Sequence, residues 1–426
     1  MRLLFRSVIA ALPLACCFGQ APLRLTLADA RRLAIQNNPQ VTAASLTAAA
    51  AHQVPAQYHA NFEPSLSGAF TTVGADNGTR LAAGGLNNPV VYDRIGSGLA
   101  VGQLITDFGR TSNLVAMSRL QAEARDQATQ TARAQVLLEV SRAYFALLRA
   151  QSVMKVADQT VASRQVVVDQ VTALAQSQLK STLDVSFANV NLADARLLQV
   201  QAQNDVKSAE ANLAAALGLP GTAGFILSEE PMPPALPDTV DTLIRQALQD
   251  RPELKDLRLQ QTADQRFAKA EHDLYFPSVG VAGTAGFVPA GSAVIPGKYG
   301  AIGLNVQIPV FNGGLFKARQ AEAELKAQAA GQNVSDLENR VTRDVRVAYL
   351  NATTAYDRLA LTQQLLQQAQ LALDLAQNRY DLGLGSIVEL SQAQLNLTSA
   401  QMADTTARYD YQTQRLIVDY QIGALR

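Results

Sequence analysis

Two stretches of about 70 residues, each without a proline, constrain the fold of this chain more than any other feature. One begins after Gly109 and the other after Gly314, and alanine, leucine, valine and glutamine dominate both. A single helix of this length would be roughly 105 Å long at 1.5 Å per residue. Such a helix cannot bury itself within a compact domain, so it needs neighbours along its whole length, as in a coiled coil. We therefore expect an all-α part built from long helices over about 110–178 and 314–382.

The chain also repeats itself after roughly 205–213 residues. The matching segments keep their order along the chain: NNPQVTAA at 37–44 and DRPELKDL at 250–257, LITDFG at 104–109 and IPVFNG at 308–313, VSRAYFALLRA at 140–150 and VRVAYLNATTA at 345–355, STLDV at 181–185 and SIVEL at 386–390. A repeat of this length indicates the duplication of one architectural half rather than a solenoid unit. We expect a first repeat over 20–219, a proline-rich linker over 220–240 and a second repeat over 241–426.

Each repeat carries two short segments that read as β-strands. They span about 62–73 and 95–105 in the first repeat, and about 277–288 and 299–309 in the second. The last segment alternates most clearly, with apolar residues on one face and small or polar residues on the other: Ile302, Leu304, Val306 and Ile308 against Gly303, Asn305 and Gln307. This pattern suits a membrane strand between lipid and a wet lumen, and it also suits a half-buried strand of a soluble sheet.

The number of strands in one chain determines whether that chain could close a membrane barrel by itself. No stretch of 18 apolar residues without charge follows the N-terminal segment, so we expect no transmembrane helix. If the strands enter a membrane, they must close into a barrel. Four strands per chain are too few, because about eight are needed to fill a barrel and more are needed for a channel. The strands therefore require further copies of the chain.

Composition argues against several functional classes. Lys+Arg and Asp+Glu both number 36, so no global charge favours nucleic acid as a partner. Three histidines and two cysteines leave little material for a metal site, and no metal or other cofactor is expected. We find neither a histidine–carboxylate cluster nor a phosphate-binding glycine loop, so no catalytic residue is expected.

Residues 1–19 read as a secretory signal peptide, with a positively charged start and an apolar run from Val8 to Ala15. Cleavage near Gly19 would leave a mature chain without thiols, because both cysteines precede that site. The segment Leu14-Ala15-Cys16-Cys17 loosely resembles a lipobox, which makes Cys17 a candidate for lipidation. The alternative is that both cysteines are incidental residues of a removed peptide.

Several motifs together resemble the TolC family of outer-membrane efflux proteins over essentially the whole mature chain. They are LTLADARRLAIQNNPQV at 25–41, LITDFGR at 104–110, IPVFNGG at 308–314 and RYDLGLGSIVELSQAQ at 379–394. The resemblance implies a homotrimer with a 12-stranded β-barrel in the outer membrane of a Gram-negative bacterium. Twelve helices would form a tunnel across the periplasm, and residues 220–240 would lie in its equatorial region.

The same resemblance implies a passive exit duct for tripartite efflux or type I secretion. An inner-membrane pump supplies the energy, and a periplasmic adaptor protein docks at the helical tip. The exported substrate is not indicated, since drugs, metal ions, solvents and proteins leave through similar ducts.

Three residues correspond to the periplasmic gate of the family. Tyr380 lies where the family has a tyrosine that helps to close the tunnel, and the alternative is an ordinary packed helix tyrosine. Asp184 and Glu389 lie where the family has acidic residues at the tunnel mouth. Both also fit a helix-capping pattern, with Ser181 and Ser386 three residues earlier.

The adaptor-docking tip corresponds to two short turns. The second repeat supplies Gly383, Leu384 and Gly385, and the first supplies Gln178, Leu179 and Lys180. Two positions depart from the prototype of the family. Gly385 replaces an arginine that locks the closed state, and Gln392 replaces a second ring of acids. Lys180 partly replaces the missing positive charge.

A periplasmic coiled-coil scaffold that forms no channel is the competing interpretation. It accounts for the long helices but not for the amphipathic strand pairs. Dependence on detergent for extraction separates the two, because only the channel has a lipid-facing surface.

Overall fold

The computed structural model describes residues 23–76, 94–219, 224–237, 239–288 and 297–425. The expected signal peptide, with Cys17, lies outside these residues, as do 220–223 and 238 of the expected linker. The chain divides into two compact units. Unit 1 comprises residues 1–38, 136–236 and 351–417, and unit 2 comprises residues 39–135, 237–350 and 418–426.

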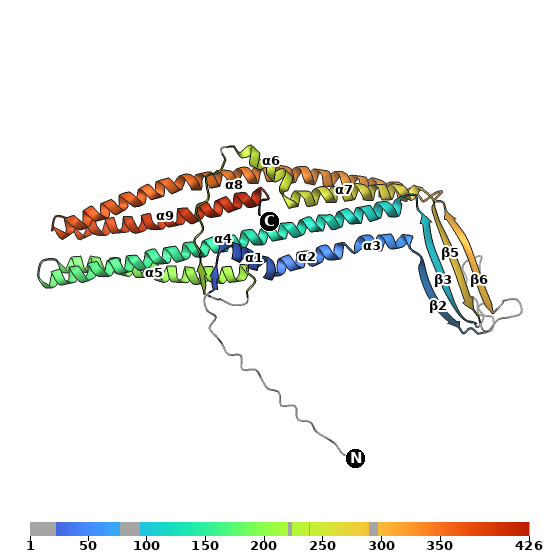
Figure 1. Cartoon of the computed structure of the whole chain (residues 1–426), viewed down its shortest axis with the longest axis horizontal. Helices are drawn as coiled ribbons and strands as arrows, with labels where there is room; N and C mark the ends of the chain where they lie inside the picture. The colour runs from blue at the N-terminus through green and yellow to red at the C-terminus, as the bar shows by residue number, and fades with distance from the viewer. Residues whose placement is uncertain (1–22, 77–93, 220–223, 238, 289–296, 426) are drawn as a thin grey trace, which may run out of the picture. The chain divides into compact units, whose positions relative to one another are not determined.

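The two repeats have similar element orders (Figure 1). The first repeat contains β1 (Leu23–Leu25), α1 (Leu27–Asn37), α2 (Pro39–Ala51), α3 (Val54–His59), η1 (Ala60–Phe62), β2 (Ser65–Val73), β3 (Arg94–Thr106), α4 (Arg110–Gln176) and α5 (Thr182–Ala216). It is followed by β4 (Phe225–Leu227), α6 (Val240–Asp250), α7 (Pro252–His272), η2 (Asp273–Tyr275), β5 (Ser278–Phe287), β6 (Lys298–Gln307), α8 (Leu315–Asp381) and α9 (Ile387–Gln421).

Helices α4 and α8 each run without interruption for 67 residues. Both begin directly after residues with positive φ, Gly109 at 119° and Gly314 at 85°, where the chain leaves the strand direction. The side chain of Asp107 accepts a hydrogen bond from the backbone N–H of Thr111 at 2.8 Å, which satisfies a free donor in the first turn of α4.

Three successive helices, α1, α2 and α3, precede the first strand of the large sheet. Asn38 is extended, with φ −72° and ψ 122°, because the ring of Pro39 disfavours helical geometry in the preceding residue. A second break separates Ala51 from Val54, where Pro55 occupies the first turn of α3. Proline thus starts new helices in this segment, whereas its absence lets α4 and α8 continue.

Unit 2 contains an antiparallel sheet of four strands in the order β2-β3-β5-β6 (Figure 1). Residues directly opposite one another share a face of the sheet. One such row crosses all four strands through Leu66, Val101, Gly283 and Ile302, and the next row, on the opposite face, contains Ser67, Ala100, Thr284 and Ala301. These rows show that one face of the sheet is largely apolar and the other mainly small or polar. The register shifts between Leu104 and Thr106, where β3 contains a bulge against β5.

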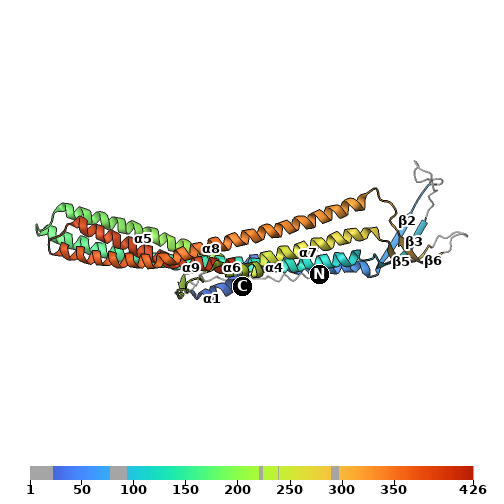
Figure 2. The same ribbon diagram turned by 90° about the horizontal axis from the view of Figure 1, so that it is seen from above.

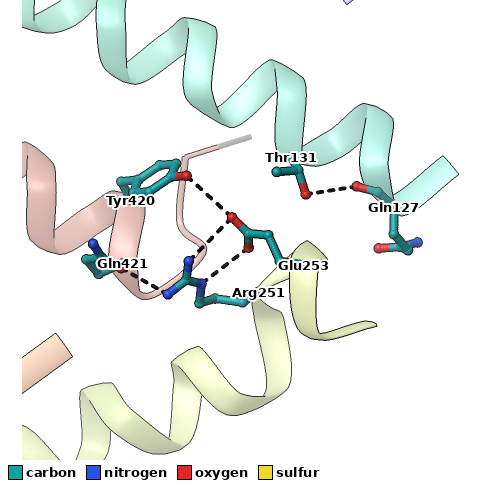
Figure 3. Close-up of polar contacts among 6 residues, drawn as sticks. All are labelled: Gln127, Thr131, Arg251, Glu253, Tyr420 and Gln421. Atoms are coloured by element: carbon teal, nitrogen blue, oxygen red, sulfur yellow. Dashed lines mark hydrogen bonds and ion pairs between the residues drawn. The ribbon is translucent and has the colours of Figure 1, made fainter. Parts of the chain in front are cut away.

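A polar cluster fixes the end of α9 within unit 2 (Figure 3). The largely buried Arg251, between α6 and α7, donates to the carboxylate of Glu253 at 3.2 and 3.4 Å and to the Gln421 side chain at 3.0 Å. The Tyr420 hydroxyl donates to Glu253 at 3.4 Å. Burial, followed by the charge of Glu253, raises the pKa of Tyr420.

Unit 1 consists mainly of two helical hairpins, one between α4 and α5 and the other between α8 and α9 (Figures 1 and 2). A short parallel sheet of β1 and β4 lies in the same unit. The buried Tyr144 of α4 donates to the carbonyls of Leu25 and Ser228, next to these two strands. No helix in the described ranges is long and apolar enough to cross a membrane.

Candidate functional site

The turn between α4 and α5, residues 177–181, is the first tip turn. The Leu179 N–H donates to the Leu174 carbonyl at 2.9 Å, and the Gln178 N–H donates to the Ala175 carbonyl at 3.0 Å. This pair of bonds is a Schellman motif, which ends a helix through one residue with positive φ. Gln178 supplies that residue at φ 60°, although it is not a glycine.

The turn between α8 and α9, residues 382–386, is the second tip turn and repeats the motif. The Leu384 N–H donates to the Arg379 carbonyl at 2.8 Å, and the Gly383 N–H donates to the Tyr380 carbonyl at 3.1 Å. Gly383 holds the positive φ, at 74°. A Cβ atom added at Gly385 would lie 3.2 Å from both Arg379 Cβ and the Tyr380 nitrogen, so a larger residue there must shift its neighbours.

The two acidic candidates use their carboxylates differently. Asp184 forms a reciprocal capping box with Ser181: its N–H donates to the Ser181 hydroxyl, and its carboxylate accepts from the Ser181 N–H at 3.0 Å. The capping predicted from sequence at this turn is therefore confirmed. The Glu389 N–H donates to the Ser386 hydroxyl at 3.1 Å, but the Glu389 carboxylate pairs instead with Arg379 at 3.1 Å.

Tyr380 is buried within a single chain, with 2% of its surface exposed. It belongs to a hydrophobic cluster contributed by both hairpins: Val167, Val168 and Val171 of α4, Ala188 and Leu192 of α5, Tyr380 of α8, and Ile387 and Leu390 of α9. Its hydroxyl oxygen has no hydrogen-bond partner in the described part of the chain. Burial, followed by the charges of Asp184 and Asp381, raises the pKa of Tyr380.

Lys180 of the first tip turn connects the two hairpins. Its Nζ lies 4.2 Å from the centroid of the Tyr380 ring, a cation–π geometry. A positive charge from the first tip turn thus lies over the ring of the second hairpin. The outermost side chains are apolar and exposed, and Leu179 and Leu384 each have 70% of their surface accessible.

The structure brings the expected residues together at the free ends of the two hairpins of unit 1. Arg379 was not singled out from the sequence, although it pairs with Glu389 and its Nη2 donates to the Leu384 carbonyl at 3.3 Å. A basic residue in the last turn of α8, followed by an acid in the first turn of α9, is the signal that indicates such a pair across a short turn. Among the described residues, no group of three His, Cys, Asp or Glu side chains is placed to hold a metal ion.

Curated relatives of similar sequence are outer-membrane proteins. The outer membrane protein TolC of Salmonella enteritidis is 24% identical over 370 residues, covering 83% of this chain and 74% of the relative. The solvent efflux pump outer membrane protein SrpC of Pseudomonas putida is 25% identical over 415 residues, covering 93% of this chain and 84% of the relative. Neither name describes an enzyme.

Solved structures of outer-membrane channels share the fold. CusC aligns with a TM-score of 0.80 at 18% identity, covering 96% of this chain and 95% of the other. The CmeC outer membrane channel of Campylobacter jejuni aligns with a TM-score of 0.77 at 19% identity, covering 93% and 85%. The model of the family described as outer membrane efflux protein matches residues 30–219 and 243–423. The chain therefore belongs to the outer membrane efflux protein family, the family of TolC.

Proposed function

We propose that this chain forms, as a homotrimer, the outer-membrane exit duct of a tripartite efflux or type I secretion system. The duct is passive: an inner-membrane pump supplies the energy, and a periplasmic adaptor joins the pump to the duct. The observation that carries this proposal is the two-faced sheet of unit 2, because its apolar face is left exposed by the described part of the chain.

The apolar face is suited to lipid. Ile302 and Leu304 of β6 are 82% and 67% exposed in the single chain, and Leu66 and Phe70 of β2 are also exposed. The opposite face presents mainly small or polar residues at the paired positions, although Leu104 and Tyr299 also lie on it. An outward apolar face and an inward small or polar face are the pattern of a membrane strand around a wet lumen.

The edges of the sheet support assembly of several copies. In the described sheet, β2 and β6 each have one hydrogen-bonded neighbour, so each leaves one row of backbone donors and acceptors unpaired. Lipid cannot satisfy such groups, and closure into a barrel does. With four strands from each of three copies, the barrel has 12 strands, wide enough for a lumen.

Exposed apolar residues on the long helices support the same assembly. On α5, Leu183, Phe187, Val190 and Leu197 are exposed at spacings of three, four and seven residues. On α8, Leu361 and Leu365 are exposed at a spacing of four. Residues at these spacings form one stripe of a helix, and packing against a second copy would remove the stripe from water.

The tip turns form the periplasmic end of the proposed duct. Tyr380, Asp184 and Glu389 would be contributed once by each protomer to the gate. The adaptor would dock on the exposed turn residues, with Leu179 and Leu384 as apolar contacts beside Gln178, Lys180, Gly383 and Gly385. In a trimer, Glu389 gives a ring of three acids, each paired with Arg379 of its own chain, which attracts cations less than unpaired acids would.

A matched pair of substitutions in β6 tests the proposal. Leu304→Arg on the apolar face should impair membrane insertion, at about 2–4 kcal/mol near the bilayer midplane. Asn305→Arg, one residue later on the other face, should insert normally. Heat-resistant trimers in outer-membrane fractions measure insertion, and light scattering in detergent measures the assembly. Equal effects of the two substitutions, or a stable monomer without detergent, would contradict the proposal.

A further inference from the structure

A cavity of about 160 Å³ lies within unit 1 among α4, α8 and α9. Its lining includes the polar residues Arg164, Gln394, Gln401 and Ser163 together with the apolar Leu373 and Leu397. Arg164 precedes Gln178 by 14 residues on α4, which places it about 20 Å from the first tip turn. The cavity therefore lies away from the tip turns, although Leu373 of its lining packs against the hydrophobic cluster that contains Tyr380.

Arg164 is a buried cation without a counter-charge in this lining. Only 4% of its surface is exposed, and its Nη1 atom has no hydrogen-bond partner in the described part of the chain. No aspartate or glutamate lines the cavity. Burial lowers the pKa of Arg164 to about 10, so the side chain is still protonated at neutral pH. A buried charge with no partner is unfavourable, and a bound anion would compensate it.

The glutamine side chains of the cavity can also donate hydrogen bonds to an anion. Guanidinium N–H groups only donate hydrogen bonds, and a glutamine amide supplies two more donors. Gln394 of α9 is buried with 6% exposed surface and lines the cavity beside Arg164. The hydroxyls of Thr160 and Thr398 donate to carbonyls of their own helices at 2.8 and 3.1 Å, so they have no proton left to bind an anion.

We propose that this cavity binds a small inorganic anion, chloride in the first instance, held by Arg164 and the amide of Gln394. Its volume admits such an ion with a few waters, since a water takes about 30 Å³ in the liquid. Because Arg164 lies on α4 and Gln394 on α9, the anion joins the two hairpins of unit 1. Binding to the folded state alone then raises its stability as the anion concentration increases.

Thermal unfolding of the full chain in detergent tests the site. The midpoint should rise saturably, on the order of 1 °C, when potassium chloride or bromide replaces potassium gluconate at constant ionic strength, because gluconate is too large for the cavity. Arg164→Met should abolish this dependence. In gluconate the variant should be at least as stable as the parent, because it lacks the uncompensated charge.

Arg196→Met provides the matched control. Arg196 lies exposed on α5 of the same unit and donates to the Gln165 side chain at 3.1 Å, so its removal deletes one positive charge away from the cavity. This variant should keep the full chloride dependence. Loss of the dependence in both variants would show that the anion effect does not depend on the cavity, and would overturn the site.

Crystals grown with bromide give a direct measurement. An anomalous peak within hydrogen-bond distance of the Arg164 guanidinium, absent in Arg164→Met, is the expected result. Water alone at this place, or a carboxylate from a second copy of the chain, overturns the proposal. So does a chloride dependence that persists in Arg164→Met.

Discussion

The turn between α4 and α5 and the turn between α8 and α9 close with the same two backbone hydrogen bonds, yet different residues complete them. The residue with positive φ is Gln178 at 60° in the first tip turn and Gly383 at 74° in the second. A side chain in this conformation is disfavoured by contact of its Cβ with the following carbonyl, and glycine avoids that cost. The first tip turn thus keeps its geometry against the local preference of its own residue.

The acidic residues of the two tip turns also bind different partners. The Asp184 carboxylate closes on the N–H of its own cap residue, whereas the Glu389 carboxylate reaches across the second tip turn to Arg379. Aspartate is one methylene shorter than glutamate, which suits the local bond. The comparison teaches that the backbone of the duplicated turn persists while its side chains take different partners.

The largest effect is expected at Tyr380, whose counterpart in the first repeat is Ala175, 205 residues earlier. Tyr380→Ala should remove about 3–5 kcal/mol from the local stability of the second tip turn, as for other large aromatic residues in cores. Because the ring also packs the two hairpins together beside the proposed constriction, single-channel conductance in planar bilayers should rise. Hydrogen exchange of the α8–α9 turn amides measures the stability.

Tyr380→Phe is the control, because it removes only a hydroxyl that has no partner in the described part of the chain. Removing an unsatisfied buried polar group is nearly neutral or stabilising. The variant should therefore exchange and conduct like the parent. If Tyr380→Phe opens the channel as much as Tyr380→Ala, an interaction of the hydroxyl in the trimer, rather than packing, closes it.

A reciprocal exchange of the turn residues should give smaller effects of opposite sign. Gly383→Gln should destabilise the second tip turn, and Gln178→Gly should stabilise the first, each by about 1 kcal/mol. The exchange rates of the Leu384 and Leu179 amides, which complete the two motifs, report these changes. A loss of stability in Gln178→Gly would mean that contacts of the Gln178 side chain, rather than the backbone, hold the first turn.

These turns also mark how far the sequence predicts the structure. Gly383 after a long apolar pattern indicates a helix end, because glycine favours positive φ. Gln178 carries no such signal, and only its place in the repeat identified the turn. The pair between Arg379 and Glu389 depends on how the chain folds back, which periodicity does not describe.

The same limit applies to the sheet of unit 2. The period-two alternation predicted that Leu304 and Val306 lie on the same face of the sheet. The pairing of β6 with β5 confirms this prediction. The bulge between Leu104 and Thr106 has no counterpart in that pattern. The strand expected over 299–309 ends at Gln307 in the structure, two residues before Pro309, which has no N–H for pairing.

The smallest effects on stability are expected at the two acids, and salt should distinguish them. Asp184→Asn keeps an oxygen that can accept the Ser181 N–H, so it should cost little at any ionic strength. Glu389→Gln removes an ion pair that is about half exposed, worth on the order of 0.2–1 kcal/mol at low salt. At 1 M salt that cost should vanish, because the screening length falls to about 3 Å.

Ion selectivity should change more than stability in these variants, because it depends on the charge at the mouth of the proposed tunnel. In the proposed trimer, Glu389→Gln removes three charges from the mouth while the size of the side chain hardly changes. The preference for cations, measured from reversal potentials in a salt gradient, should therefore fall with little change in conductance. Asp184→Asn removes three charges as well, because the Ser181 N–H and hydroxyl that bind the Asp184 carboxylate at 3.0 Å each are neutral donors. If Asp184→Asn changes selectivity more than Glu389→Gln, the first turn rather than the second lines the constriction.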